Sequence, residues 1–174
     1  MNNISSLMVI SLFAPLCLLT SCKEEKVSIQ KPDNLETHSQ PMPTGGVVVD
    51  DRFGKEVWFA YGSINGEGDT SANGVLQAHY FEDGSYAQEM QLNIQRPEDG
   101  SFFEAWLINP DTGDLISAGH LHTMFGDVRH ANQFTSDIDY RSYTIVHVTK
   151  ELDDGDPKPS DILVAKGTLK PVER

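Results

Sequence analysis

The chain has 174 residues and carries 26 acidic against 13 basic side chains, which gives a formal net charge of −13 at pH 7. This length indicates one domain. A surface this acidic repels nucleic acid and anionic lipid headgroups, so the composition argues against a nucleic-acid partner and against membrane binding through a basic patch.

The N-terminal segment, residues 1–21, has the features of a lipoprotein signal peptide. It contains no Asp, Glu, Lys or Arg, and its apolar run from Leu7 to Leu19 spans 13 residues. That run is shorter than the roughly 20 residues that a membrane helix needs, and it suits the core of a signal peptide. The segment departs from the usual pattern because no basic residue precedes the apolar run. An uncleaved short anchor and a plain secretory signal are the alternatives.

Cys22 is the predicted lipidation site. Leu19-Thr20-Ser21-Cys22 resembles a bacterial lipobox, in which the cysteine is lipid-modified and becomes the first residue of the mature chain. Cleavage there would leave no free thiol, so we expect a domain without a disulfide that is held to the membrane by its lipid. Lys23 stands where some Gram-negative lipoproteins carry the Asp that retains them at the inner membrane. In an organism of that kind, the outer membrane is therefore favoured.

The rest of the chain divides into a tether and a β domain. Residues 22–45 contain three prolines and few apolar residues, which predicts a flexible tether. Residues 46–174 show short β-prone runs separated by turn signals, with a long polar loop over 64–74, and no window has a helical stripe. This pattern predicts an all-β domain, an antiparallel β-sandwich. The expected strands are 47–50, 56–64, 75–81, 86–94, 102–108, 115–125, 141–150 and 161–172.

Part of this domain resembles a known family. The runs 86–94, 103–108, 115–119 and 144–149, followed by the turn 154–160, are similar to the extracytoplasmic C-terminal domain of the anti-sigma-K factor family. The resemblance covers roughly residues 75–170 and implies an immunoglobulin-like β-sandwich outside the cytoplasm, a sensory or interaction module without catalytic residues to transfer. The family's sigma-binding helical segment and membrane span have no counterpart here, because a lipobox takes their place. Sigma-factor binding is therefore not implied.

A candidate metal site lies in the segment His120-Leu121-His122-Thr123-Met124. On a strand, the two histidines would face the same side about 7 Å apart, and a pair of this kind can bind Cu²⁺ or Zn²⁺ with a third ligand. Met124, Asp127 and His130 are the candidate further ligands. The alternative is that both histidines lie on the solvent face of a strand whose buried face carries Ile116, Ala118, Leu121 and Phe125, with a bulge.

Two weaker sites can also be read from the sequence. The acidic turn with Asp153, Asp154 and Asp156, flanked by Glu151 and Asp161, could bind Ca²⁺, although its order does not match an EF-hand loop. Glu104 lies in an apolar strand and is either a carboxylate with a raised pKa or the partner of a basic group such as Arg129 or Arg141.

The sequence as a whole favours a lipid-anchored protein of the cell envelope, on the outer membrane or the periplasmic face. We expect the β-sandwich to be a non-enzymatic binding or interaction module with an envelope protein as a possible partner. The alternative function is copper or zinc binding by the HLHTM segment. An enzyme acting on envelope polymers through Glu104 would need a second carboxylate in a cleft.

Overall fold

The computed structural model describes residues 46–123 and 126–173. The predictions for the signal peptide, Cys22, the tether and Met124 lie outside these residues. The described residues contain strands and no helix, which confirms the all-β prediction. The strands are β1 (Val49–Asp50), β2 (Gly54–Gly66), β3 (Ala72–Phe81), β4 (Tyr86–Ile94), β5 (Ser101–Ile108), β6 (Leu115–His120), β7 (His122–Thr123), β8 (Arg129–Ser136), β9 (Ile145–Leu152), β10 (Leu163–Thr168) and β11 (Lys170–Pro171).

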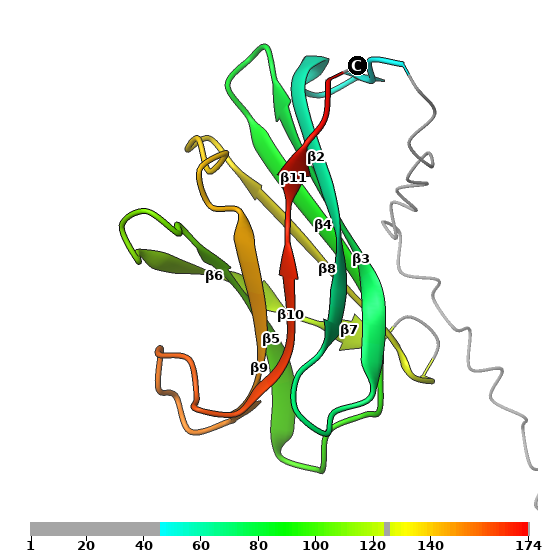
Figure 1. The fold of residues 1–174 in the computed structure, drawn as a ribbon, viewed down its shortest axis with the longest axis vertical. Coiled ribbons are helices and arrows are strands. Elements are labelled where there is room, and N and C mark those ends of the chain that lie inside the picture. The colour runs from blue at the N-terminus through cyan, green and yellow to red at the C-terminus, as the bar shows by residue number, and fades with distance from the viewer. Residues whose placement is uncertain (1–45, 124–125, 174) are drawn as a thin grey trace, which may run out of the picture. The chain divides into compact units, whose positions relative to one another are not determined.

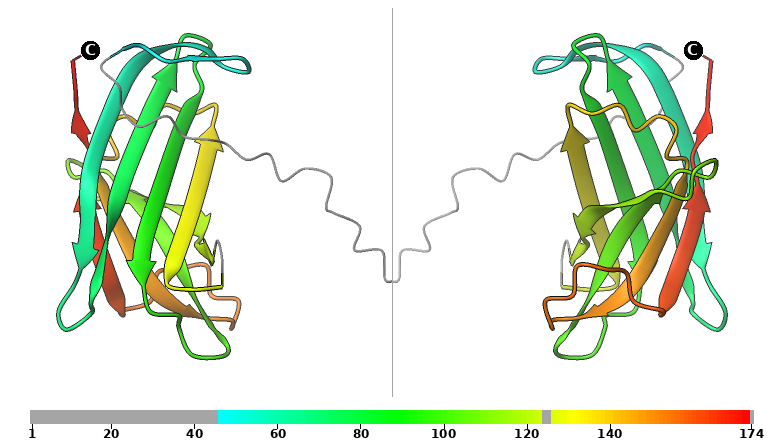
Figure 2. Two further views of the ribbon diagram at one scale, coloured as in Figure 1. Left: turned by 90° about the vertical axis from the view of Figure 1, so that its right-hand side faces the viewer. Right: turned by 90° about the vertical axis from the view of Figure 1, so that its left-hand side faces the viewer.

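All the pairings are antiparallel and join the strands into one sheet. The order is β6-β5-β9-β10-β2-β3-β4-β8-β7, and β1 and β11 also pair with β2. The sheet curls until β6 approaches β8, so β2, β3, β4 and β8 form one wall and β5, β6, β9 and β10 the other (Figure 1). Figure 2 shows the first wall face-on with the second behind it. The result is a nearly closed barrel-like sheet. The finer prediction of an immunoglobulin-like sandwich is not confirmed, because β2 and β10 are hydrogen-bonded to each other and join the two walls.

The core lies between the two walls and is built by alternation along the strands. In β4, Met90, Leu92 and Ile94 are buried while Gln91 and Asn93 are exposed. In β5, Phe103, Ala105 and Leu107 face the core from the other wall. The period-two pattern in the sequence therefore identified the inward faces of both strands.

Several polar side chains are also buried in the core. Gln88 is 0% exposed, and neither its Nε2 nor its Oε1 has a hydrogen-bond partner within the described ranges. The hydroxyl of Tyr86, two residues earlier on the same face of β4, is buried and unpartnered in the same part of the chain. Each such group costs about 1–3 kcal/mol when it is left unsatisfied. Replacing such a group with an apolar one of the same shape would remove this cost.

The sheet is closed at one point by a side chain. Asn132 on β8 is buried, and its Nδ2 donates to the carbonyl oxygens of Ala118, Gly119 and His120 at 2.9, 3.2 and 3.2 Å. Gly119 has a positive φ of 93°, which turns the end of β6 away from regular pairing. The Asn132 amide thereby satisfies carbonyl groups that a regular strand would have paired.

Candidate binding groove

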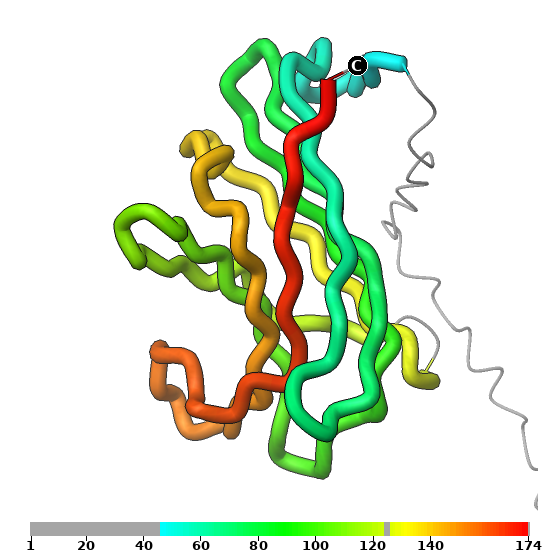
Figure 3. The backbone as a smooth tube through the Cα atoms, in the orientation of Figure 1, coloured from blue at the N-terminus to red at the C-terminus, as the bar shows by residue number. Residues whose placement is uncertain are grey.

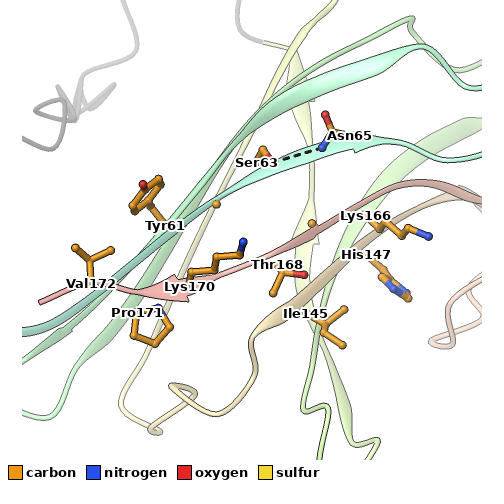
Figure 4. A pocket seen from close by; sticks show the side chains of 12 residues that line it. Tyr61, Ser63, Asn65, Ile145, His147, Lys166, Thr168, Lys170, Pro171 and Val172 are labelled. Carbon is orange, nitrogen blue, oxygen red and sulfur yellow. Dashed lines mark hydrogen bonds between the residues drawn. The ribbon is translucent and has the colours of Figure 1, made fainter.

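A groove runs along the outer face of the sheet, where β9, β10, β11 and β2 lie side by side. The C-terminal strands run alongside β2 over most of its length (Figure 3). The groove has a volume of about 810 Å³ and is open to solvent. Its lining side chains come from three stretches far apart in the sequence and share one face (Figure 4). They are Tyr61, Ser63, Asn65, Ile145, His147, Lys166, Thr168, Lys170, Pro171 and Val172, together with Gly62 and Gly167.

One end of the groove carries a row of three nitrogen-bearing side chains. His147 on β9 lies opposite Lys166 on β10, and Lys166 lies opposite Asn65 on β2. Residues directly opposite on neighbouring strands project to the same face, with Cβ atoms about 5 Å apart. Asn65 Nδ2 also donates to the hydroxyl of Ser63 at 3.4 Å, as the dashed line in Figure 4 shows. This end can therefore offer both hydrogen-bond donors and a positive charge.

The other end of the groove pairs a cation with an aromatic ring. Lys170 lies opposite Tyr61, and between the two ends Thr168 lies opposite Ile145. The ring of Tyr61 belongs to a residue that is 52% exposed, so it presents an open apolar surface with a polar tip. Lys166, Thr168 and Lys170 are alternate residues, which is why all three project into the groove.

The floor of the groove depends on a close approach of two strands. A Cβ atom on Gly62 would lie 2.0 Å from the carbonyl oxygen of Thr168, closer than any real contact. Leu169, which follows Thr168, points into the core, where it is 2% exposed, and its N–H donates to the Thr144 carbonyl oxygen at 2.8 Å. Glycine at position 62 is therefore required for β2 to lie this close to the backbone of Thr168.

The charge in the groove is positive, in contrast to the acidic chain. Lys166 forms an ion pair with Glu67 at 2.8 Å, whereas no described carboxylate forms an ion pair with Lys170. Burial, and then the charge of Lys166, lower the pKa of His147, although Glu67 opposes the shift. His147 is therefore neutral at pH 7, and the free positive charge lies mainly on Lys170.

The two histidines of the predicted metal site lie on different strands. His120 ends β6, His122 begins β7, and Leu121 between them turns into the core with its N–H donating to the Phe103 carbonyl oxygen at 2.8 Å. His120 and His122 are both exposed, and the ring of His120 packs on Phe102 with centroids 4.1 Å apart. The alternative interpretation is confirmed for Ile116, Ala118 and Leu121, all of which pack in or against the core.

The two described candidate ligands beyond the histidine pair have other partners. The Asp127 carboxylate binds Arg129, with Nε donating to Oδ2 at 2.9 Å and Nη2 to the same oxygen at 2.5 Å. His130 is 3% exposed, and its Nδ1 donates to the Val128 carbonyl oxygen at 3.0 Å. Because His122 lies opposite Ala131, it faces away from the side on which His130 is buried.

No group of three or more His, Cys, Asp or Glu side chains is arranged to hold a metal ion within residues 46–123 and 126–173. The copper or zinc site and the calcium site both stay predictions. In the acidic turn, Glu151 is buried and accepts the Ser160 N–H at 3.0 Å, and the Asp154 carboxylate accepts the N–H of Asp156 at 3.0 Å. These carboxylates stabilise the turn itself.

Glu104 faces outward with Trp106, as the alternation of the strand predicted. The expected pairing of Glu104 with Arg129 or Arg141 is wrong, because Arg129 binds Asp127 and Arg141 binds Asp139. Glu104 instead accepts a hydrogen bond from the hydroxyl of Ser117 on β6. The two side chains lie close together because β5 and β6 are paired strands.

A buried network occupies the same face as Glu104. Trp106 Nε1 donates to Thr149 Oγ1 at 2.8 Å, and that hydroxyl donates to Glu151. Glu151, the second carboxylate on this face, also accepts a hydrogen bond from the Ser160 N–H and so fixes the chain around Ser160. The contacts of Glu104 and Glu151 therefore indicate a structural role for both carboxylates.

Comparisons of the chain with protein-family models, with curated proteins and with solved structures found no match. The resemblance to the anti-sigma-K outer domain therefore stays a prediction. Among the described residues, no helix has the length and apolar character needed to cross a membrane.

Proposed function

We propose that this chain is a lipid-anchored protein of the cell envelope and that its β domain is a non-enzymatic binding module. The groove over β2, β9, β10 and β11 is the binding surface. The anchor is the lipid on Cys22, and the location is the outer membrane or the periplasmic face.

One observation carries the proposal. The groove presents two lysines, of which Lys166 is paired with Glu67, together with hydroxyls, an amide and an open aromatic ring on an otherwise acidic protein. Strand pairing fixes the backbone positions from which these side chains project, so their spacing is set before a ligand arrives. The half-buried Glu104 and the buried Glu151, the two carboxylates weighed for catalysis, are already hydrogen-bonded to Ser117, Thr149 and Ser160.

Site-specific photo-crosslinking in intact envelopes tests this proposal. A photoreactive phenylalanine derivative replaces Thr168 in the groove, and the matched control replaces Thr135, an exposed threonine on the outer face of β8. We expect light-dependent adducts of the full chain from position 168 and none from position 135. No adduct from position 168, or equal adducts from both positions, would contradict the proposal.

A further inference from the structure

We propose that the ligand of the groove is a sparsely charged acidic polysaccharide, such as a polymer that contains uronic acids. This inference rests on the proposed function, because it takes the groove as the binding surface. It adds the chemical class of the ligand. Three features of the groove support it: the spacing of its cations, the neutral groups between them and the pairing of its strands.

The spacing of the two lysines sets the charge density that the ligand can have. Lys166 and Lys170 are four residues apart along β10 and β11, which corresponds to about 13 Å of extended chain. A nucleic-acid strand carries one phosphate per about 3.4 Å, or about four over that distance. Two lysines on a chain of net charge −13 cannot neutralise such a density. A polymer with one carboxylate per several ångströms of length can meet the charge of Lys170, which no described carboxylate neutralises, and can share Lys166 with Glu67.

The groups between the lysines suit sugar rings. Thr168 and Ser63 offer hydroxyl groups, and Asn65 offers an amide, so hydroxyl-bearing ligands find both donors and acceptors. Tyr61, opposite Lys170, and Ile145, opposite Thr168, offer apolar surface at two positions along the groove (Figure 4). A sugar ring has an apolar face and a polar rim, and an amphipathic ring such as that of Tyr61 can cover the former while its hydroxyl meets the latter.

The pairing of the strands argues against an extended acidic peptide. β10 lies between β9 and β2, and β2 lies between β10 and β3, so the edges of both strands are occupied. A peptide strand could not add along β10, and β11, which pairs with β2 alone, offers an edge of only two residues, of which Pro171 has no N–H to donate, so the main-chain hydrogen bonds by which an extended peptide usually joins a sheet are largely missing here. The ligand must bind through side chains of the outer face, which favours a polymer that brings its own hydroxyl groups.

Calorimetry on the full chain in detergent tests the ligand class. The probes are an oligosaccharide of uronic acids, a neutral dextran oligosaccharide, an oligothymidylate and a poly-glutamate peptide of similar length. The variant is Lys166→Gln/Lys170→Gln, and the control is Arg96→Gln/Lys158→Gln, which changes the net charge equally at exposed positions outside the groove. Tyr61→Ala removes the aromatic surface without changing the charge.

We expect the acidic oligosaccharide to bind the parent and the control equally, with a Kd about tenfold higher in the lysine variant. Tyr61→Ala should weaken binding as well, and neutral dextran and oligothymidylate should not bind. Binding of oligothymidylate or poly-glutamate through the same lysines would overturn the ligand class. If no sugar binds but position 168 still forms adducts in envelopes, the ligand class is wrong while the groove remains the binding surface. If position 168 forms no adducts either, the proposed function fails.

Discussion

Asn132 Nδ2 donates to the Ala118 carbonyl oxygen at 2.9 Å across the gap between β8 and β6. This contact joins two strands that lie far apart in the order of the sheet, and it is reinforced by bonds from the same nitrogen to Gly119 and His120. The closure of the barrel-like sheet at this point therefore combines this side-chain amide with the short backbone pairing of β7, which follows β6 after Leu121, with β8.

Replacing Asn132 should open this closure. We expect Asn132→Leu to lower the free energy of unfolding by about 2 kcal/mol, because the buried Ala118 carbonyl and the part-buried carbonyls of Gly119 and His120 lose their shared donor. Urea denaturation measures the loss, and hydrogen exchange at Leu121 and neighbouring amides should quicken. The control is Asn93→Leu, an exposed residue with a single bond to Asn73 at 3.1 Å, which should change stability by less than about 0.5 kcal/mol. Equal losses in the two variants would contradict this role for Asn132.

Gln88 lies on β4, the strand next to β8, and in contrast to Asn132 its amide has no hydrogen-bond partner among the described residues. Both of its polar atoms are buried without a described partner, so we expect Gln88→Met to leave the free energy of unfolding unchanged or to raise it by about 1 kcal/mol. Methionine keeps the length and removes both unsatisfied groups. The measurement is urea denaturation beside Asn132→Leu. A loss of stability as large as that of Asn132→Leu would show that the Gln88 amide has strong partners.

Glu89 should make stability depend on pH. Burial raises the pKa of Glu89 to about 7, although the charge of Arg52 and the hydrogen bond from Gln133 act in the other direction. The folded state therefore binds this proton more tightly than the unfolded chain, and the associated stability is lost as the pH rises from about 4.5 to about 7. We expect Glu89→Gln to stabilise the domain by about 1–2 kcal/mol at pH 8, since solvent screens part of the effect, and by less at pH 5.

The measurement for Glu89 is denaturant unfolding at the two pH values. Glu82→Gln, at an exposed turn position, controls for the change in net charge. A gain at pH 8 that is no larger than the gain at pH 5, or an equal gain in the Glu82 variant, would argue against a specific effect of Glu89.

Metal content separates the binding module from the alternative function. We expect the full chain, purified without a histidine tag, to hold less than one equivalent of copper or zinc and to keep its Tm after EDTA treatment. His120→Ala/His122→Ala should change neither value, with His147→Ala as the control. One equivalent of metal that raises Tm and is lost only in the double variant would instead establish an envelope metal-binding protein.

The sequence predicted the elements with clear periodicity. The strand expected over 86–94 has those bounds in the structure, because its apolar and polar residues alternate throughout. The turns before Tyr86 and Leu115 were also expected, and Gly84 and Gly113 adopt positive φ there. β8 was missed because its inward residues include His130 and Asn132, so polar residues stand where the pattern requires apolar ones.

Other predicted bounds were wrong as well, among them 141–150, where the strand is Ile145–Leu152, and two of these errors have identifiable reasons. The loop expected over 64–74 is shorter, because Ile64 is buried and Asn65 pairs with Asn73, which extends both strands through glycine-rich sequence. The strand expected over 115–125 is divided at Leu121, after the positive φ of Gly119. The polar composition of 64–74 suggested a loop and the apolar residues of 115–125 suggested one continuous strand. In both segments the pairing with neighbouring strands, rather than the local composition, determined the structure.

The groove could be predicted only in part. The alternation of Lys166, Thr168 and Lys170 is visible in the sequence and indicates one face of a strand. Its partners Tyr61 and His147 could not be assigned, because the pairing of β10 with β2 and β9 depends on how the whole sheet curls.

Crosslinking with and without the lipid anchor tests most directly whether the anchored domain binds an envelope component through the groove. The photoreactive residue at position 168 is placed in the parent chain and in a Cys22→Ala chain. We expect the parent in the membrane fraction with adducts, and the Cys22→Ala chain in the soluble fraction with far fewer, because the anchor raises the local concentration of the groove. A Cys22→Ala chain that stays in the membrane fraction, or a parent chain that forms no adducts, would contradict the account.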